Sequence, residues 1–520
     1  MKSLKYLWLS SLSGLFLGLS WPTYGLTYLI FIGFVPLLIL IKTELSNYPL
    51  KLFGCLFLSF LLWNTISTNW LFHASIAGML FAIIVNSALM SLTFILFSVV
   101  SKRINEKLSY IFLISLWISF EKFHLIWDFS WPWLNLGNVF SSKIELIQWY
   151  EYTGAFGGTL WIILINILIF KVLEDYFNKK NITKKCTALL VFFALPIISS
   201  KYIFETTEIK GKPTDFFIVQ PNIDPYNDKY KASNFDNYLY LYNILKKNKI
   251  KNHTIIAPET FFSEGIHKNS FRHDELNRRL QIIKNEFNSE ILTGIELFEI
   301  IYDSSEIKDY SNQLNDGRRW LNLFNSATFI SDEIQYYNKS KLVVGVEKMP
   351  YKKILEPIIG KSLMNFGGST YTRGYEDFRK NFRSSDKFKI SPIICYESVY
   401  GEYVTEYTKG GSNIFAIITN DGWWGDSQGH KQHISYSRLR AIENRRNIVR
   451  SANTGISAVI NYKGQIVNEI GYGQEGFIKE NIELLDDLTF YARYGDFIFR
   501  ISFFFLVIIF LHYFATILKR

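Results

Sequence analysis

The chain has 520 residues, of which 49% are hydrophobic, 17% aromatic and only 20% charged. This composition excludes an intrinsically disordered chain, and its charged fraction is low for a soluble protein of this size. The net charge of +10 would by itself permit nucleic acid as a partner. The three cysteines, Cys55, Cys186 and Cys395, lie far apart, so we expect neither a disulfide framework nor a CxxC metal site.

Apolar stretches dominate the first two hundred residues and return at the end of the chain. A membrane-spanning helix needs about 20 mostly apolar residues, so we expect seven spans in the N-terminal part and an eighth at the C-terminus. The first two spans are short and flank a turn-like string at 21–25, which predicts a tight hairpin. The expected spans are 7–21, 26–41, 52–70, 76–100, 110–127, 159–177, 187–204 and 501–518.

Two of these stretches have features that weaken the interpretation as spans. The stretch 7–21 follows Lys2 and Lys5, as the apolar core of a cleaved signal peptide would. We favour a span, because no small-residue cleavage site follows and further apolar stretches begin at once. The stretch 110–127 is interrupted by three polar side chains, those of Glu121, Lys122 and His124.

Lysine and arginine residues in short loops predict the orientation in the membrane. If the N-terminus lies inside, the outer short loops hold only Lys122 and Lys143. The inner segments then hold Lys2, Lys5, Lys42, Lys51, Lys102, Arg103, Lys107, Lys171, Lys179, Lys180, Lys184, Lys185, Lys519 and Arg520. The long segment after residue 204 is therefore expected outside and the C-terminus inside. Because much of the basic excess is a topology signal, we do not expect nucleic acid as a partner.

The segment 211–488 alternates short β-like runs with charged helical stretches, which favours an α/β domain. We expect a membrane domain at 1–210, an α/β domain at 211–488 and a C-terminal transmembrane helix at 489–520. Expected strands lie at 215–220, 253–258, 290–294, 389–394 and 414–418, and expected helices at 236–247, 281–288 and 432–443. Hairpins are expected at 326–337 and 458–469.

Reactive side chains follow three of the expected strands: Glu259, Lys339 and Cys395. Functional sites of α/β sheets gather at the carboxyl ends of strands. A carboxylate can take the proton of a thiol, and a lysine can stabilise an oxyanion. Considered alone, such a cysteine is more often a small buried hydrophobe, and a single Glu or Lys is usually a solvated surface charge.

The strings around these three residues carry more information. They are Ile256-Ala257-Pro258-Glu259-Thr260, Tyr336-Tyr337-Asn338-Lys339-Ser340 and Pro392-Ile393-Ile394-Cys395-Tyr396-Glu397. In this order they resemble the Glu-Lys-Cys triad of the nitrilase superfamily, and the segments 418–425, 438–446 and 450–455 agree with it. The membrane half narrows the resemblance to the apolipoprotein N-acyltransferase family, through the strings at 19–22, 34–38, 131–137 and 154–158.

The resemblance implies a multi-span α-helical membrane domain joined to an extracytoplasmic α/β domain of the nitrilase-like α-β-β-α sandwich type. It implies that Glu259 is the general base, Lys339 the oxyanion stabiliser and Cys395 the nucleophile. Three further residues match supporting positions of the family's active site: Glu347, Tyr396 and Glu397. It implies no metal and no organic cofactor.

The chain departs from the family pattern in several places. One concerns a tryptophan shortly after the first strand, for which Tyr230 is the nearest aromatic residue by spacing. Ala257 stands where a tryptophan is usual, and Gly422 stands where alanine is usual. The usual Pro-Phe-Gly before the second glutamate is here Val344-Gly345-Val346, so the turn beside Glu347 is expected to differ.

The implied reaction is the transfer of a fatty acyl group from a phospholipid to a diacylglyceryl apolipoprotein, through a thioester on Cys395. The implied location is the bacterial inner membrane, with the catalytic domain on the periplasmic side. The first alternative is a membrane-tethered nitrilase or amidase that passes its acyl group to water. The second is a catalytically inactive lipid-binding or scaffold protein, which the intact triad disfavours.

The apolar stretch 349–366 is interpreted either as a lid that dips into lipid or as a core helix.

Overall fold

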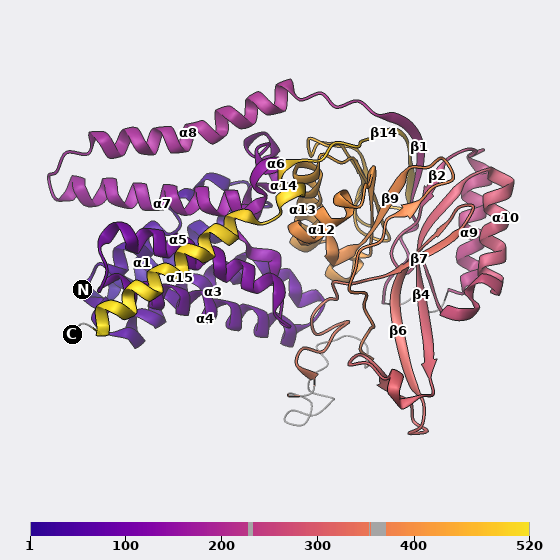
Figure 1. The fold of residues 1–520 in the computed structure, drawn as a ribbon, viewed down its shortest axis with the longest axis horizontal. Helices are drawn as coiled ribbons and strands as arrows, with labels where there is room; N and C mark the ends of the chain where they lie inside the picture. Colours follow the sequence, from indigo (N-terminus) through magenta and orange to yellow (C-terminus); the bar gives the residue numbers. More distant parts are fainter. Residues whose placement is uncertain (1, 227–231, 353, 355–370, 519–520) are drawn as a thin grey trace. The chain divides into compact units, whose positions relative to one another are not determined.

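The computed structural model describes residues 2–226, 232–352, 354 and 371–518, and Figure 1 draws its fold. The chain divides into two compact units. One unit contains Met1–Thr207 and Tyr494–Arg520, and the other contains Glu208–Arg493. We call them the helical unit and the sheet unit.

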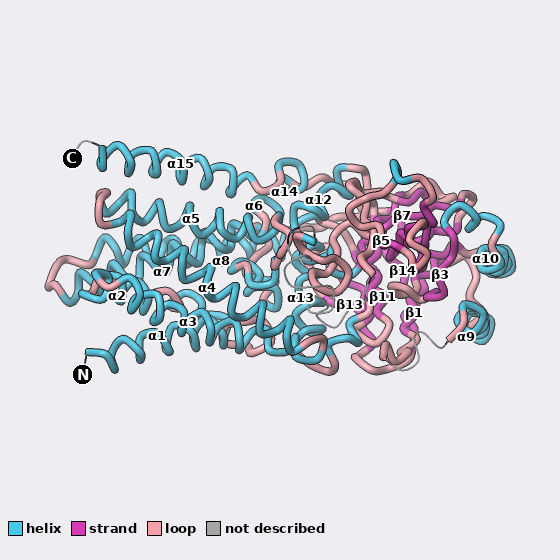
Figure 2. Tube along the Cα trace, turned by 90° about the horizontal axis from the view of Figure 1, so that it is seen from below, coloured by secondary structure: helices cyan, strands magenta, loops and turns pink. Residues whose placement is uncertain are grey.

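The helical unit consists of α-helices of varied length joined by turns and 3-10 helices (Figure 2). Its helices are α1 (Lys2–Leu19), α2 (Val35–Ile41), α3 (Pro49–Thr68), α4 (Ile76–Ser101), α5 (Glu106–Ile126), α6 (Tyr150–Thr153), α7 (Ala155–Phe177), α8 (Thr183–Thr206) and α15 (Phe497–Leu518). Packing joins α1 to α3, α3 to α4, and α5 to α15. Among the described residues, six helices are long and apolar enough to cross a membrane: α3 continued to His73, α4, α5, α7, α8 and α15.

The first two expected spans are not among these six. Lysines and serines lower the mean hydropathy of α1, and the stretch 26–41 is divided into a 3-10 helix, η1 (Thr27–Ile32), and α2. At the break, the Asn166 side chain on α7 donates to the Ile30 carbonyl at 2.9 Å and accepts from the Phe34 amide at 2.8 Å. A buried amide thus supplies hydrogen bonds that the interrupted helix cannot make. Both η1 and α2 pack against α1, as the predicted hairpin requires.

Glu121, which interrupts the fifth expected span, is buried inside the helical unit. Its carboxylate accepts hydrogen bonds from Trp117 Nε1 at 2.9 Å, the Leu136 amide at 2.7 Å and Thr159 Oγ1 at 2.7 Å. A buried carboxylate is costly unless donors satisfy it. Glu121 therefore ties α5 to α7 and to the segment that precedes α6, and it does not prevent α5 from being long and apolar enough to span.

The sheet unit contains two β-sheets with helices on both outer sides. Its strands are β1 (Lys212–Gln220), β2 (Thr254–Ile256), β3 (Phe262–His267), β4 (Glu290–Ile301), β5 (Asn312–Gln313), β6 (Trp320–Ile330), β7 (Ile334–Asn338), β8 (Phe382–Arg383), β9 (Lys389–Ile394), β10 (Ile414–Thr419), β11 (Ile448–Ala452), β12 (Ser457–Ile460), β13 (Ile466–Ile470) and β14 (Gly476–Leu484). One sheet has the order β14-β1-β2-β4-β6-β5, with β3 beside β4 and β7 beside β6. The other has the order β13-β12-β11-β10-β9-β8.

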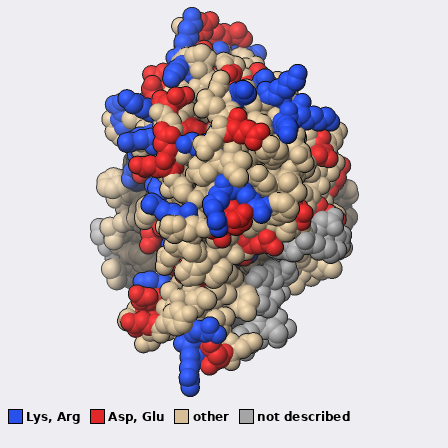
Figure 3. All heavy atoms as spheres, turned by 90° about the vertical axis from the view of Figure 1, so that its right-hand side faces the viewer, with Lys and Arg blue, Asp and Glu red and all other residues tan. Residues whose placement is uncertain are grey.

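Four main helices cover the sheets: α9 (Asn234–Lys247), α10 (Glu275–Phe287), α12 (Gly401–Lys409) and α13 (Gln428–Asn444). Figure 1 places α9 and α10 on one outer side and α12 and α13 on the other. The layers are therefore α-β-β-α, which confirms the predicted fold class. On the outer face that carries α9 and α10, positive and negative side chains are interspersed, as on a solvated surface (Figure 3).

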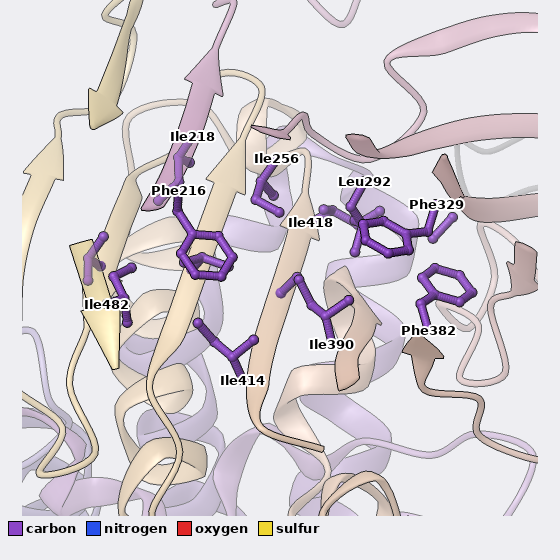
Figure 4. Packing of buried hydrophobic residues seen from close by; sticks show 14 of the residues in the cluster. Phe216, Ile218, Ile256, Leu292, Phe329, Phe382, Ile390, Ile414, Ile418 and Ile482 are labelled. Carbon is purple, nitrogen blue, oxygen red and sulfur yellow. The ribbon is translucent and has the colours of Figure 1, made fainter. Parts of the chain in front are cut away.

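The alternation of side chains along the strands builds two cores. On β1, Phe216 and Ile218 point between the sheets, whereas Phe217 and Val219 pack toward α9 and α10. Successive residues of a strand face opposite sides, so one strand serves both layers. Figure 4 shows side chains of both sheets, among them Ile418 of β10, meeting in the core between the sheets.

The strands expected from the sequence are all present, and both expected hairpins form antiparallel pairs, β6 with β7 and β12 with β13. The strands β3, β5, β8, β11 and β14 and the helix α12 were not expected from the sequence. Parallel pairing of β1, β2 and β4, and of β9, β10 and β11, brings the carboxyl ends of these strands to a common edge of each sheet.

Candidate active site

Three predicted site residues come from three strand ends. Glu259 follows β2, Lys339 follows β7 and Cys395 follows β9, and all three side chains are buried. Lys339 Nζ lies 3.0 Å from Glu259 Oε1. The charges of Glu259 and Lys339 both act on the Cys395 thiol, so the fold brings the predicted triad together.

The ammonium group of Lys339 lies between two carboxylates. Besides Glu259, Lys339 Nζ contacts Glu347 Oε2 at 2.9 Å and Glu347 Oε1 at 3.1 Å. Burial would lower the pKa of Lys339, but Glu259 and Glu347 outweigh burial and hold this pKa well above its usual range. Burial alone would raise the pKa of Glu347, yet Lys339, the Val343 amide and Asn325 together lower it. The lysine is therefore a permanent cation in a buried site.

Asn325, on β6, is a site residue that the sequence analysis missed. Its Nδ2 donates to Glu259 Oε1 at 2.7 Å and to Glu347 Oε1 at 2.9 Å. Its backbone carbonyl accepts from the Lys339 amide at 2.8 Å. One side chain thus holds both carboxylates against the ammonium. The sequence feature that could have indicated Asn325 is a polar amide side chain within a strand of mostly apolar residues.

Glu259 is also held by the second sheet. The backbone amide of Asn420, directly after β10, donates to Glu259 Oε2 at 3.0 Å. On the other side, the Gly294 amide of β4 donates to the Pro258 carbonyl at 3.1 Å. A Cβ at Gly294 would lie 2.2 Å from the Thr260 nitrogen, so only glycine permits this approach. Both carboxylate oxygens of Glu259 are therefore fixed by named donors.

Cys395 begins the 3-10 helix η9 (Cys395–Val399) with φ +49°, in the left-handed region that non-glycine residues rarely adopt. Burial, followed by the charge of Glu259, raises the pKa of the Cys395 thiol, and Lys339 opposes this rise. The thiol therefore keeps its proton at neutral pH. Because the thiolate is the nucleophile, attack by Cys395 needs a base that removes this proton as the reaction proceeds.

The two residues after Cys395 are buried as well, and their surroundings differ. Tyr396 packs its ring 5.3 Å from that of Tyr400. Glu397 accepts hydrogen bonds at 2.7 to 2.8 Å from Tyr337 Oη, Tyr403 Oη, the Ser340 amide and the Ile394 amide. Burial raises the pKa of Glu397. Glu397 therefore joins the loop after Lys339 to the loop that holds Cys395.

A cavity of about 10 Å³ lies beside Glu259 and is lined by residues that include Ile223, Thr260 and Asn453. Among the described residues, no group of three or more His, Cys, Asp or Glu side chains is arranged to hold a metal ion. The arrangement of a buried thiol, a carboxylate and a cation suits nucleophilic attack by Cys395 on a carbonyl carbon.

Comparison with known proteins identifies the family of the chain. The carbon-nitrogen hydrolase family model matches residues 218–486, just over half of the chain. The chain belongs to this family. A second model, the apolipoprotein N-acyltransferase N-terminal domain, matches residues 13–168 of the helical unit. The resemblance predicted from the sequence is thereby confirmed in both units.

Similar proteins cover nearly the whole chain. The apolipoprotein N-acyltransferase of Chlorobaculum tepidum is 27% identical over 95% of this chain and 93% of its own length. The protein of the same name from Geobacter metallireducens is 26% identical, over 93% of this chain and 91% of its own. Among solved structures, Nit3 of Saccharomyces cerevisiae, from branch 10 of the nitrilase superfamily, is similar with a TM-score of 0.36 and 15% identity, over 53% of this chain and 92% of that one.

The departure from the family pattern at 344–346 does not displace Glu347. Gly345 adopts φ +78°, and the Glu347 amide donates to the Val343 carbonyl at 2.9 Å. The Val343 amide in turn donates to Glu347 Oε2 at 2.8 Å, so a glycine turn directs this carboxylate to Lys339. Of the apolar stretch 349–366, residues 353 and 355–366 lie outside the described residues, and both interpretations of that stretch stay predictions.

Replacing Asn325 by alanine should shift the pH dependence of Cys395 acylation. The substitution removes a donor that favours the charged form of Glu347, so the pKa of Glu347 should rise and the acid limb should move to higher pH. We also expect the maximal rate to fall by about 10²-fold, because the carboxylates lose their alignment. Release of p-nitrophenol from a p-nitrophenyl ester, followed across pH, measures both effects.

The matched control is Asn322→Ala, which removes another buried asparagine of β6 whose Oδ1 accepts from Ser311 and contacts neither glutamate. This variant should keep the wild-type pH profile. An acid limb that stays in place in Asn325→Ala would contradict the role given to Asn325.

Proposed function

We propose that the protein transfers a fatty acyl group from a phospholipid to the N-terminal diacylglyceryl-cysteine of an apolipoprotein, through a thioester on Cys395. The observation that carries this proposal is the buried Lys339–Glu259 pair, 3.0 Å apart, beside the Cys395 thiol. The names of the relatives and the helices long enough to span a membrane support a lipid donor and a lipoprotein acceptor.

The first step forms the acyl-enzyme. Glu259 accepts the thiol proton while Cys395 Sγ attacks the carbonyl carbon of the phospholipid ester. The oxyanion that develops is stabilised by the Lys339 ammonium. The ester C–O bond then breaks, and the proton passes from Glu259 to the leaving oxygen. The products are a thioester on Cys395 and a lysophospholipid.

The second step transfers the acyl group to the acceptor. The neutral α-amine of the diacylglyceryl-cysteine attacks the thioester carbon, and Glu259 accepts a proton from the nitrogen. The C–S bond breaks, and the proton passes from Glu259 to the thiolate of Cys395. The product is an N-acylated, triacylated lipoprotein. Since a thioester retains much of its reactivity toward amines, no further activation of the acyl group is required.

Glu347, Asn325 and Glu397 would position the reacting groups. Glu347 and Asn325 keep Lys339 and Glu259 aligned through contacts of 2.7 to 3.1 Å. Glu397 holds the loop of Lys339 against that of Cys395. Tyr396, buried beside Cys395, would support the nucleophile by packing.

The proposed location is the bacterial inner membrane, with the sheet unit on the periplasmic side. The distribution of lysine and arginine in short loops supports this orientation. A second candidate function is a membrane-tethered amidase-type hydrolase, which the match to the carbon-nitrogen hydrolase family favours. The two functions differ in whether an amine or water accepts the acyl group from Cys395.

Incubation with phospholipid should add one acyl mass to the wild-type protein, and Cys395→Ala should abolish this addition. Cys55→Ala and Cys186→Ala are the matched controls, because both cysteines are partly buried residues of helices. They should acquire the acyl group as the wild type does. Intact-protein mass spectrometry, with hydroxylamine to cleave a thioester, measures the result. An adduct that persists in Cys395→Ala would refute the assignment of the nucleophile.

Glu259→Gln and Lys339→Ala should both slow acylation, for different reasons. The first removes the base, and the second removes the oxyanion donor, whose loss typically costs about 10² to 10³ in rate. The double variant should lose little beyond Glu259→Gln, because residues of one catalytic set act together. Single-turnover release of lysophospholipid measures the rates, and thermal unfolding verifies the fold. A wild-type rate in either single variant would exclude the role of that residue.

A further inference from the structure

A histidine outside the proposed triad contacts the backbone of Cys395. His433, on α13, places Nε2 3.2 Å from the Cys395 carbonyl oxygen and 3.0 Å from Ser398 Oγ. Ser398 Oγ donates to the same carbonyl oxygen at 2.7 Å. The side chains of His433 and Ser398 are fully buried. Two polar side chains that the proposed mechanism does not use therefore converge on one oxygen atom of the nucleophile.

The other side of the imidazole is fixed by an ion pair. His433 Nδ1 lies 2.9 Å from Asp421 Oδ1 and 3.0 Å from Arg450 Nη2. Arg450 Nη2 also donates to Asp421 Oδ2 at 2.8 Å, and Thr419 Oγ1 donates to Asp421 Oδ1 at 2.7 Å. Burial would raise the pKa of Asp421, but Arg450 and His433 hold it well below its usual range. The imidazole is thus supported by a carboxylate that stays ionised.

The residues that contact the imidazole of His433 come from elements of the same sheet as Cys395. Asp421 begins the 3-10 helix η10 (Asp421–Trp424) after β10, and Arg450 lies on β11. The ring of Trp424 packs 5.4 Å from that of His433. Because β9, β10 and β11 are paired in one sheet, the support of the imidazole and the nucleophile belong to the same rigid scaffold.

The Cys395 carbonyl needs such support because of the backbone conformation. At φ +49°, Cys395 lies in a region that non-glycine residues occupy only where surrounding structure imposes it. A carbonyl oxygen can only accept, so we assign the proton of His433 to Nε2, which then donates to the Cys395 carbonyl. In that tautomer Nδ1 accepts from Arg450 Nη2, which Asp421 holds in place. The peptide unit is planar, so fixing this oxygen also fixes the direction of the Tyr396 N–H on its opposite side.

We propose that His433 is a positioning residue that holds the Cys395 carbonyl, and with it the left-handed backbone that presents the thiol. The inference rests on the proposed function, since it assumes that Cys395 is the nucleophile. Asp421 and Arg450 orient the ring, and Ser398 supplies the second hydrogen bond to the carbonyl. His433 touches no reacting atom in this account and acts through Cys395.

Two variants of His433 separate this role from simple core filling. The carboxamide nitrogen of His433→Gln reaches the position of Nε2 and can donate to the Cys395 carbonyl. The shorter His433→Asn retains a polar group near Nδ1 and Asp421 but cannot reach that carbonyl. The matched control is His430→Gln, one turn earlier on α13, where the buried histidine contacts Asp426 and Tyr472 instead.

The experiment measures acylation of Cys395 by phospholipid in the full-length, detergent-solubilised protein, together with thermal unfolding. We expect His433→Asn to slow acylation by about 10²-fold, as misplacement of a reacting group does. His433→Gln should recover at least a tenth of the wild-type rate, and His430→Gln should match the wild type. Equal rates in the two His433 variants, or a faster rate in His433→Asn, would overturn the inference.

A third variant covers the case in which both His433 variants fail to fold. Ser398→Ala removes the other donor to the Cys395 carbonyl with little change in volume, and it should slow acylation while unfolding close to the wild-type temperature. An unchanged rate in a folded Ser398→Ala protein would overturn the inference in that case. Failure of the wild type to acquire an acyl group on Cys395 would instead refute the proposed function, so the two failures are distinguishable.

Discussion

The site depends on one buried cation. Lys339 is almost fully enclosed, and its ammonium contacts Glu259 at 3.0 Å and Glu347 at 2.9 Å. Buried charges are tolerated only when partners and hydrogen bonds compensate their desolvation, and removal of one partner leaves the others uncompensated. The donors from Asn325, Val343 and the Asn420 amide complete this compensation. The same contacts that make the cation tolerable therefore fix the positions of the groups proposed to react.

This constraint explains why the site needs two sheets. Glu259 and Lys339 come from the first sheet, and Cys395 comes from the second. The apolar core between the sheets sets their separation, and the Asn420 amide joins the second sheet to the Glu259 carboxylate. The backbone of Cys395 is bonded from the side of α13 by His433. The alignment of the site residues therefore depends on the packing of the core between the two sheets.

Sequence patterns predicted the features that depend on local periodicity and on strand ends. The strands β1, β2, β9 and β10 were recognisable as apolar runs. Glu259 and Cys395 follow two of them, Lys339 follows the second strand of a predicted hairpin, and the strings around the three residues identified them as a set. β11 and β14 were missed because polar side chains interrupt their patterns: Arg450 is buried on β11 by its pairing with Asp421, and β14 alternates exposed with buried residues. Asn325 and His433 were missed for a different reason. Each contacts residues that are far away in sequence, so its partners cannot be deduced from a local pattern, even where a polar residue in a strand stands out.

In the helical unit, too, the sequence predicted the elements but not the contacts that compensate buried polar groups. Hydropathy identified the long helices, but it could not reveal that Asn166 completes the hydrogen bonds of an interrupted segment or that Glu121 is satisfied by three donors. Length and apolarity are properties of a segment, whereas compensation of a buried polar group is a property of the assembled fold.

We propose that Cys395 carries an acyl group from a phospholipid to an amine. The most direct test is a pulse-chase experiment: the protein is acylated with a phospholipid labelled in its acyl chain, freed of donor, and mixed with a diacylglyceryl-cysteinyl peptide. We expect the label to leave Cys395 at a rate that rises with peptide concentration and to appear as an amide on the peptide N-terminus. Loss of label only as free fatty acid, at the same rate with and without peptide, would contradict this proposal and identify a hydrolase.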